Sequence, residues 1–443
     1  MAKSMHLVLF ATSTGLHMGG WRHPEAQNAN ELDIDFYQDL AYKAEAAKLD
    51  MLFVADKLAI DDLYGGTFDL SVTYRLVLSV EPITLISALS SVTKKIGLAA
   101  TASTTYQEPY HIARMFSTLD HLSKGRVAWN MVTSTSDTEA RNFGKTQHLD
   151  HSARYERATE FIEVVTSLWD SWEEDALILD KHEGVYARKA KVHYTNHDGK
   201  WFNVKGPLNV SRSPQGRPLI IQAGASEDFQ LSASKNADLI FSVSPTLEKA
   251  KIFYDQFKEK VAANHRSKED VKILPGLMPI VGRTLQEAKE KERLLRTLIN
   301  PHAALSFMSG SMNYDLSLHD PDSPFPDILD KITGSRGRFE YVLKKAKQEN
   351  LTLGEAAQWY AVSLSFPLLV GTPDFIAEEL ETWYKEEACD GFILIPPYMP
   401  GGLDDFLELV VPILQKKQIF RSDYTGDMLR DHLGLDIPRN RYS

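Results

Sequence analysis

Short apolar runs alternate with amphipathic segments along most of this chain. The runs are compact and almost uninterrupted, as in buried strands, whereas the segments between them carry apolar residues at helical spacing. We expect strands at residues 5–11, 51–55, 96–102, 126–132, 218–223, 239–243, 273–281 and 391–395. Eight strands separated by helices are what a (β/α)₈ barrel requires, so the pattern predicts a (β/α)₈ TIM barrel.

A doubly wound parallel sheet is the alternative arrangement of the same elements. Its dinucleotide-binding form is disfavoured because no G-x-G-x-x-G motif follows the first strand. The count of strands and their strict alternation with helices favour the barrel. We therefore expect one TIM-barrel domain that spans residues 1–443.

Two connections are much longer than a barrel needs. One follows the fourth strand, at about residues 134–216, and the other follows the seventh, at residues 282–372. Long insertions in barrels are usually active-site lids or binding loops. For the second insertion, a surface decoration or a dimer contact is the alternative.

Composition narrows the classes of function. Of the 443 residues, 43% are hydrophobic, and 49 basic against 60 acidic residues give a net charge of −11, which disfavours binding to nucleic acid. The single cysteine, Cys389, excludes an intrachain disulfide and a cysteine-based zinc site, and its apolar surroundings suggest a core residue. No run approaches the length of a membrane span and no signal segment is evident, so we expect a cytoplasmic protein.

The stretch at residues 200–229 contains a candidate phosphate site. The fifth predicted strand ends in the sequence QAGAS, in which Ser226 directly precedes helix-forming sequence. This pattern predicts a strand, a tight turn and a helix N-cap, and the amides of a helix N-terminus attract anions. An ordinary capped helix is the alternative. Glu227 and Asp228 would repel a phosphate unless their carboxylates point away from it.

Polar residues after the other strands are mostly neutral hydrogen-bonding groups. They are Thr12, Ser13, Thr14 and His17 after the first strand, Asp56 after the second, Thr101 and Ser103 at the third, and Asn130, Thr133 and Ser134 at the fourth. A barrel mouth of this kind suits a planar, polar cofactor better than a hydrolytic pair of carboxylates. HExxH, GxSxG and P-loop patterns do not occur, which excludes the enzyme classes that depend on them.

Five segments together resemble a known family. They are MHLVLFATSTGLHMGGWRHP, DMLFVAD, GLAATASTTYQEPYHIARMFSTLDHLSKGRVAWNMVTS, HSARYERATEFIEVVTSLWDSW and HDGKWFNVKGPLNVSRSPQGRPLIIQAGAS. Taken in this order, they are similar to the two-component, FMN-dependent monooxygenases of the bacterial luciferase superfamily. The resemblance is to the branch of nitrilotriacetate, EDTA and dibenzothiophene sulfone monooxygenases and pristinamycin synthase, and to the Bacillus Ytn-type monooxygenases linked to sulfur compounds.

The resemblance implies a (β/α)₈ barrel that binds reduced FMN delivered by a separate NAD(P)H:flavin reductase. Dioxygen that reacts with the flavin would then oxidise a small organic substrate, such as a sulfur compound or an amine. An apolar mouth covered by insertions suits this chemistry because reactive flavin species survive only where water is excluded. Relatives are commonly homo-oligomers, so a homodimer or a homotetramer is expected.

The resemblance also implies roles for residues at the barrel mouth. Asp56 matches an aspartate that contacts the flavin, and Thr101 matches a position at the edge of the isoalloxazine ring, with Ser103 on the same face. Ser134 would approach the ribityl chain. His17 matches a histidine that faces the flavin ring and is the candidate catalytic residue, for a proton or for the substrate.

Three further residues are implied to surround the phosphate of the cofactor. His151 and Tyr155 are four residues apart where the long helix begins, so both lie on one face of it, and Ser226 would bind the phosphate itself. Each of these residues could instead be structural: His151 an exposed first-turn residue, Tyr155 a core ring and Ser226 a simple cap.

Two other readings of the function remain open at this stage. One is an F420-type deazaflavin oxidoreductase, which transfers hydride without oxygen, and the other is a non-catalytic flavin-binding protein. His302 in the second insertion is a weaker candidate for substrate contact. His193 and His197 are four residues apart but fall at a predicted hairpin turn, so we expect no metal site there.

Overall fold

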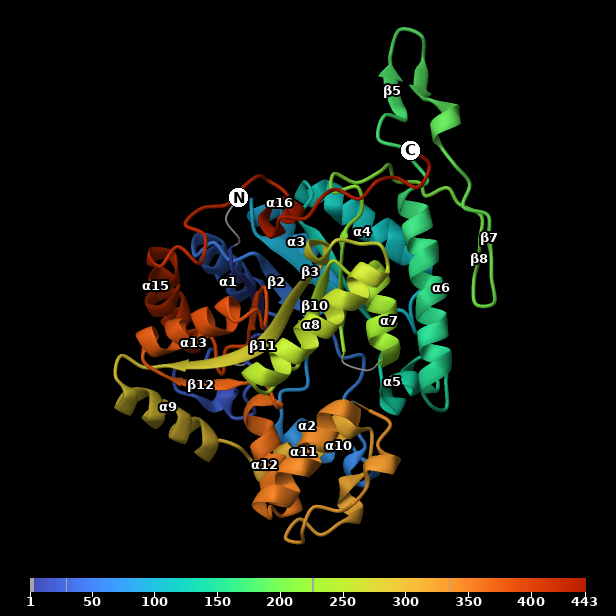
Figure 1. Ribbon diagram of the computed structural model, residues 1–443. Helices are drawn as coiled ribbons and strands as arrows, with labels where there is room; N and C mark the ends of the chain where they lie inside the picture. The colour runs from blue at the N-terminus through green and yellow to red at the C-terminus, as the bar shows by residue number, and fades with distance from the viewer. Residues whose placement is uncertain (1–3, 29, 225–226, 335) are drawn as a thin grey trace.

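The computed structural model describes residues 4–28, 30–224, 227–334 and 336–443. Eight parallel strands form a barrel surrounded by helices (Figure 1). The strands follow the order β10, β9, β4, β3, β2, β1, β13 and β11, and pairing of β11 with β10 closes the ring. Their bounds are β1 (His6–Phe10), β2 (Met51–Val54), β3 (Gly97–Ser103), β4 (Val127–Val132), β9 (Leu219–Ala223), β10 (Leu239–Ser242), β11 (Lys272–Val281) and β13 (Gly391–Leu394). The predicted TIM barrel is confirmed.

Alternate residues of each strand face the barrel interior and the surrounding helices, as the pleat requires. In β1, Val8 belongs to the interior cluster, whereas Leu7 and Leu9 belong to the layer between strands and helices. Both layers are apolar, which is why the strands read as continuous apolar runs in the sequence.

The outer layer consists of helices that each cover one stretch of the barrel wall. They are α1 (Ile34–Ala46), α3 (Pro82–Val92), α4 (Pro109–Ser123), α6 (His151–Trp169), α7 (Glu227–Asn236), α8 (Leu247–Ala263) and α13 (Pro373–Lys385), with α14 (Gly401–Asp405), a π-helical turn (Phe406–Val410), α15 (Val411–Lys416) and α16 (Leu429–Leu433) near the C-terminus. Trp129 of β4 fills the space under α4 and α6, with ring centroids 5.9 Å from Phe116 and 5.8 Å from Phe161. A side chain of this size, fully buried, stabilises the fold by several kcal/mol, on the order of 3–5.

The segment between β4 and β9 contains a helix pair and two small hairpins. Its elements are α5 (Asp137–Asn142), α6, β5 (Leu177–Asp180), β6 (Val185–Ala187), a 3₁₀ turn (Lys189–Lys191), β7 (His197–Asp198) and β8 (Asn203–Val204). The β5–β6 hairpin projects from the body of the molecule (Figure 1). Helix α6 begins at His151 because the Asp150 side chain accepts a hydrogen bond from the Ala153 amide and caps the helix.

The segment between β11 and β13 forms a helical layer at the carboxyl ends of the strands. Its elements are α9 (Leu285–Thr297), α10 (Pro301–Met312), 3₁₀ turns at Leu316–Leu318 and Leu329–Lys331, α11 (Arg336–Glu349), α12 (Leu353–Ser363) and β12 (Leu368–Gly371). Helices α10, α11 and α12 gather with α2 (Asp69–Tyr74) beneath the barrel in Figure 1. Apolar residues of α10–α12 belong to the same cluster as the barrel interior. Remaining short turns are Gly20–Arg22, Tyr64–Gly66 and Lys268–Asp270.

Strand β12 has no counterpart in the sequence prediction. It pairs in parallel with the second half of β11, with Met278 opposite Leu368 and Val281 opposite Gly371. The first half of β11 pairs with β10 and, at Gly276 and Leu277, with β13. The ten-residue β11 therefore belongs both to the barrel wall and to the base of the second insertion.

One buried aspartate, Asp170, connects distant parts of the chain. Asp170, fully buried at the end of α6, accepts hydrogen bonds from Arg212, at 2.6 Å, and from Arg217. Its backbone oxygen accepts a hydrogen bond from Asn440 in the C-terminal tail, at 3.0 Å. Asp170 thus joins α6, the segment before β9 and the tail.

Two expectations about the chain as a whole can be compared with the fold. Cys389 is buried in the main apolar cluster, as predicted, and burial raises the pKa of its thiol. Over the described ranges, no helix combines the length and the apolar character that crossing a membrane would need.

Candidate functional site

A cavity of about 1460 Å³ lies where the carboxyl ends of the barrel strands meet the second insertion. Three phenylalanines, Phe10, Phe53 and Phe241, line it from β1, β2 and β10. Their rings pack together, with centroids 5.4 Å apart for Phe10 and Phe53 and 5.7 Å apart for Phe53 and Phe241. The cavity therefore has an apolar, aromatic end formed by the barrel itself, and polar groups surround the rest.

Thr101 and Asn130 form a buried polar pair at the ends of β3 and β4. The Thr101 hydroxyl donates to the Val54 carbonyl at 2.9 Å and accepts from the Asn130 side-chain nitrogen at 2.8 Å. Both residues line the cavity and are at most 5% exposed, yet no described residue forms a hydrogen bond with the Asn130 Oδ1 atom. Because a buried acceptor without a partner is costly, this atom is poised to accept a hydrogen bond from a bound ligand.

Asp56 lies on the cavity wall directly after β2, where the sequence placed it. Burial raises the pKa of its carboxyl to about 6, helped by the nearby charges of Glu81 and Glu139, although a hydrogen bond from the Lys57 amide opposes the shift. The carboxylate can therefore change protonation just below neutral pH.

Ser103 and Ser134 are brought together, but only one of them reaches the cavity. Their hydroxyl oxygens are 3.0 Å apart, and Ser103 also accepts a hydrogen bond from the Thr105 amide. Ser134 lines the cavity and has a left-handed backbone, with φ of 57°. Ser103 is not among the lining residues, and its contact with Ser134 links it to the cavity.

The carbonyl of Ser134 is held by two cationic or potentially cationic side chains. Arg154 donates to it through Nη1 at 2.9 Å, and His148 Nε2 lies 3.1 Å from it. His148 Nε2 must donate to this carbonyl, so its Nδ1 atom accepts from the Tyr106 hydroxyl at 2.8 Å. Burial and the Arg154 charge lower the pKa of His148 to about 4, which keeps the ring neutral.

Arg154, His151 and Tyr155 form one face of the first turns of α6, and all three line the cavity. The rings of His151 and Tyr155 have centroids 4.7 Å apart. Arg154 is buried, its Nε atom has no hydrogen-bond partner, and no carboxylate of a described residue is within ion-pair distance of its guanidinium. A buried cation without a counterion is costly, so this face is suited to an anionic ligand group.

Ser226 lies outside the described residues, as does the turn residue before it, so its predicted role at the phosphate stays a prediction. The flanking residues Ala223, Gly224 and Phe229 line the cavity on the side of α6 and α7. Glu227 is exposed.

His17 is buried but is not one of the cavity-lining residues. Its Nδ1 atom accepts a hydrogen bond from the Gly19 amide at 3.0 Å, and its Nε2 atom has no hydrogen-bond partner among residues 4–28, 30–224, 227–334 and 336–443. Burial lowers its pKa to about 3, with smaller effects from the charges of Arg296 and His23. The ring is therefore neutral at physiological pH, and a role for it at the substrate stays a prediction.

The other histidines considered from the sequence lie elsewhere. His302 is exposed on α10, where its ring stacks on Tyr74. His193 lies 2.9 Å from Glu173 and His197 lies 3.1 Å from Glu160, so each pairs with a different carboxylate.

Sequence reasoning missed several polar groups that line the cavity. Arg154 was recoverable, because it is three residues from His151 and one from Tyr155 on the same helix. Lys249, Arg338 and Ser365 come from α8 and the second insertion, and no local pattern connects them to the strand ends.

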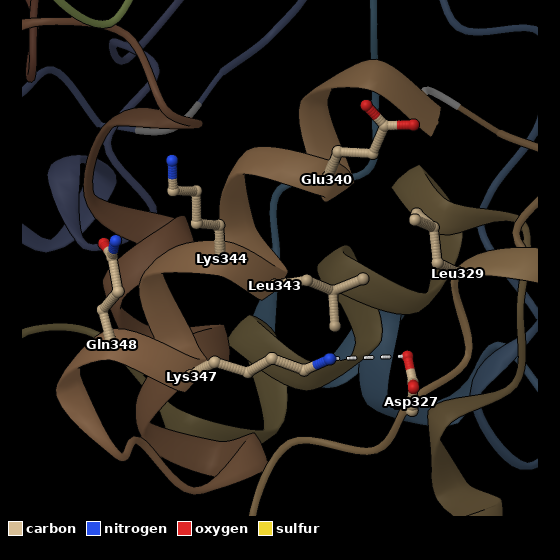
Figure 2. A pocket seen from close by; sticks show the side chains of 7 residues that line it. All are labelled: Asp327, Leu329, Glu340, Leu343, Lys344, Lys347 and Gln348. Atoms are coloured by element: carbon tan, nitrogen blue, oxygen red, sulfur yellow. Dashed lines mark ion pairs between the residues drawn. The ribbon is translucent and has the colours of Figure 1, made fainter.

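A second, smaller hollow of about 430 Å³ lies on the outer side of α11. Figure 2 shows its lining: Glu340, Leu343, Lys344, Lys347 and Gln348 lie along the helix, and of these Leu343 and Lys347 point toward Leu329 and Asp327. The ion pair between Lys347 and Asp327 spans 3.7 Å. Most of these charged groups are exposed and solvated, so the hollow has none of the buried, unpartnered atoms found in the larger cavity.

Comparison with known proteins agrees with this geometry. The family of luciferase-like monooxygenases matches residues 10–390. The N-acetyl-S-(2-succino)cysteine monooxygenase of Bacillus subtilis (strain 168) is 45% identical over 100% of this chain and 99% of its own. Component A of the nitrilotriacetate monooxygenase of Aminobacter aminovorans is 43% identical over 99% of this chain and 98% of its own.

The fold is also similar to that of a riboflavin lyase whose crystal structure is known. The crystal structure of a riboflavin lyase with modified FMN and riboflavin has a TM-score of 0.88, is 31% identical, and covers 98% of this chain and 97% of its own. The resemblance inferred from the five sequence segments is thereby confirmed. The chain belongs to the luciferase-like monooxygenase family and is an oxidoreductase that incorporates oxygen.

Proposed function

We propose that this chain is the oxygenating component of a two-component monooxygenase, which uses reduced FMN from a separate NAD(P)H:flavin reductase. The observation that carries the proposal is the composition of the large cavity. It joins an aromatic end, a buried amide oxygen without a partner and a buried arginine without a counterion. Those three features match the ring, the polar edge and the phosphate of a flavin mononucleotide.

The residues present fit the cofactor in charge and in size. The cavity exceeds the volume of a typical small-molecule site, roughly 300–1,000 Å³, so both a flavin and a substrate have room. Arg154 can form charge-assisted hydrogen bonds with a phosphate, and His151 and Tyr155 flank it on α6. Asn130 Oδ1 can accept from an N–H group of the ring, and Thr101 holds the Asn130 side chain in that orientation.

When bound, reduced FMN would supply the electrons and the reaction with dioxygen by which the substrate is oxygenated. The protein itself would bind and orient the cofactor and the substrate and shield them from water. The Ser134 carbonyl fixes the guanidinium of Arg154, and the neutral His148 fixes the same carbonyl from the other side. Asp56, with its pKa near 6, can accept or donate a proton at the cavity wall.

Exclusion of water is the second contribution of the protein. The helices of the second insertion pack on the same apolar cluster as the barrel interior and line the cavity opposite the strand ends. A closed, partly apolar chamber strengthens electrostatic contacts and suppresses loss of reactive species to solvent.

The substrate class follows from the relatives and stays a proposal. One relative is named for a thioether of succinate and cysteine and another for a tertiary amine. We propose a small organosulfur compound or amine for this chain. Its assembly as a homodimer or a homotetramer also stays a prediction.

Titration of the purified protein with anaerobically reduced FMN tests the proposal. Wild type should bind reduced FMN more tightly than oxidised FMN, and Arg154→Gln should weaken binding of reduced FMN by about 10- to 100-fold, the typical loss of a charge-assisted contact. Arg157→Gln is the matched control. It removes the same charge from α6 at a side chain that packs on Phe202 and is not a lining residue.

Equal affinity of wild type and Arg154→Gln for reduced FMN would refute the phosphate placement. Oxygen uptake with NADH, FMN and an added flavin reductase should depend on substrate. Turnover without oxygen, using a deazaflavin, would instead support hydride transfer and contradict the proposed function.

A further inference from the structure

We infer that the cavity contains a second anion site, on the second insertion, which selects substrates that carry a carboxylate. This inference rests on the proposed function, because it assumes that the α6 face serves the cofactor. It names the group on the substrate that the protein recognises and the residue that recognises it, Arg338 of α11.

The guanidinium of Arg338 lacks a compensating charge. It lies over the Phe366 ring, 5.4 Å from the centroid, and donates one long hydrogen bond of 3.4 Å to the Tyr360 hydroxyl. No carboxylate of a described residue is within ion-pair distance of it, although it is half-buried and lines the cavity. An arginine held by an aromatic face and a hydroxyl keeps most of its five N–H donors for a ligand.

Ser365 provides a second, independent indication of a ligand. Its side chain is only 4% exposed and lines the cavity, and its Oγ atom has no hydrogen-bond partner in the part of the chain that the structure describes. Ser365 and Leu364 both have left-handed backbones, with φ of 68° and 53°, which costs about 1–2 kcal/mol for a residue with a Cβ atom. The chain accepts this strain at the point where the hydroxyl enters the cavity wall, a pattern associated with binding sites.

Aromatic packing connects this anion site to the aromatic end of the cavity. Phe366 directly follows Ser365, and its ring stacks on Phe241 at 5.6 Å with an interplanar angle of 10°. Phe241 in turn packs against Phe10 and Phe53. A substrate whose carboxylate binds Arg338 would therefore have its apolar part beside the aromatic end, next to the proposed position of the flavin ring.

A second cation packs on Tyr341, which is one helical turn from Arg338 on α11. Lys249 of α8 places its ammonium 4.6 Å from the ring centroid of Tyr341, and both side chains line the cavity. The carboxylates on this side, Asp330 and Glu340, are exposed at the rim, where solvent screens them. Lys249 is exposed as well, so the half-buried charge at this end of the cavity is the positive charge of Arg338.

The site is suited to a carboxylate because a guanidinium binds that group through two parallel hydrogen bonds. Lysine lacks this geometry, so Arg338→Lys should recover only part of the binding. The ligand class is a small organic carboxylate whose apolar part carries the sulfur or nitrogen atom to be oxidised.

Equilibrium binding by calorimetry to flavin-free protein tests the inference, with two acids and their methyl esters as probes. The acids are (phenylthio)acetate and N-acetyl-S-carboxymethylcysteine. Wild type should bind at least one acid about 10- to 100-fold more tightly than its ester, and Arg338→Gln should abolish this preference while leaving ester binding unchanged. Arg338→Lys should give an intermediate preference.

Lys344→Gln is the matched control, because it removes a cation from the same helix on the outer side shown in Figure 2. It should keep the preference of wild type. An equal affinity of wild type for each acid and its ester, or an undiminished preference in Arg338→Gln, would overturn the inference.

Reduced-FMN titration of the same proteins separates this inference from the proposed function. If Arg338→Gln binds reduced FMN like wild type but loses the preference for acids, both stand. If wild type binds acids selectively but binds no reduced FMN, the proposed function fails and the anion site remains. Loss of FMN binding in Arg338→Gln with full acid selectivity would place the cofactor at α11 and overturn the inference.

Discussion

Acidification should lower the free energy of unfolding because the His17 ring is buried in its neutral form. Its ring is 3% exposed, its Nδ1 atom accepts from the Gly19 amide, and no group satisfies its Nε2 atom. Protonation would place a charge in this environment, which is why burial lowers its pKa from 6.5 to about 3. The perturbation is a change of pH from 7.5 to 5.0, applied to wild type and to His17→Asn.

The expected magnitude follows from the two pKa values. Below pH 6.5 the histidine of the unfolded chain gains a proton, whereas the folded protein takes one up only near pH 3. The unfolded state therefore binds more protons, and the stability of the fold is lost as the pH falls below 6.5. At about 1.4 kcal/mol per pH unit, the loss between pH 6.5 and 5.0 is about 2 kcal/mol.

Urea unfolding at several pH values between 7.5 and 5.0 measures this effect. His17→Asn keeps an acceptor for the Gly19 amide but cannot titrate, so its stability should fall by about 2 kcal/mol less than that of wild type over this range. His148 and His432, whose pKa values are lowered to about 4, titrate in both proteins and cancel in the comparison. Parallel stability curves for the two proteins would refute the reasoning and would mean that His17 is accessible to protons.

Three further perturbations have defined outcomes. The pKa of Asp56 is about 6 in the folded protein and 3.8 in the unfolded chain, so the stability of the fold falls as the pH rises from about 4 to 6. After allowing for the partial exposure of this carboxylate, Asp56→Asn should be more stable than wild type by about 1 kcal/mol at pH 7.5 but not at pH 4. Identical stability differences at both pH values in urea unfolding would contradict this. Asp170→Asn leaves the half-buried Arg217 without its carboxylate partner and the buried Arg212 with Glu174 alone, so it should lower the free energy of unfolding by about 3–5 kcal/mol. A loss below about 1 kcal/mol in urea would show that the network is dispensable. Ser365→Gly removes the backbone strain of the left-handed conformation and the unpartnered hydroxyl, so it should raise the free energy of unfolding by about 0.5–1 kcal/mol and weaken the binding of acids. The stability gain should appear as a higher melting temperature, and a lower melting temperature would argue against stored strain.

The barrel was predictable because its information is local. Each strand is buried on both faces, so Val8 and its neighbours Leu7 and Leu9 are all apolar and the run stands out from the helices around it. Strand β12 was not predictable for the opposite reason. It has only four residues, it is half-buried, and among the described residues it pairs with β11, ninety positions earlier in the chain.

The candidate site divides in the same way. Thr101 lies near the end of β3, and Asp56 and Ser134 come shortly after β2 and β4. The closed barrel brings strand ends together whatever the connections contain, so the position of these residues at the cavity follows from the topology. Arg338 and Ser365 reach the cavity through the packing of α11 and α12 on the barrel interior. Such packing depends on the mutual fit of distant helices, which no local spacing encodes.

The pairing of β12 with β11 has a consequence for how this fold can change. The chain leaves the barrel at Val281 and returns beside the same strand, with Gly371 opposite Val281 and the Gly282 amide bonded to the Gly371 carbonyl at 3.1 Å. The two ends of the insertion that contains α9–α12 are therefore held together by backbone hydrogen bonds, which do not depend on side-chain identity. Helices α9–α12 can therefore be replaced during evolution while the barrel strands stay the same, and such a replacement would change the substrates that the protein accepts.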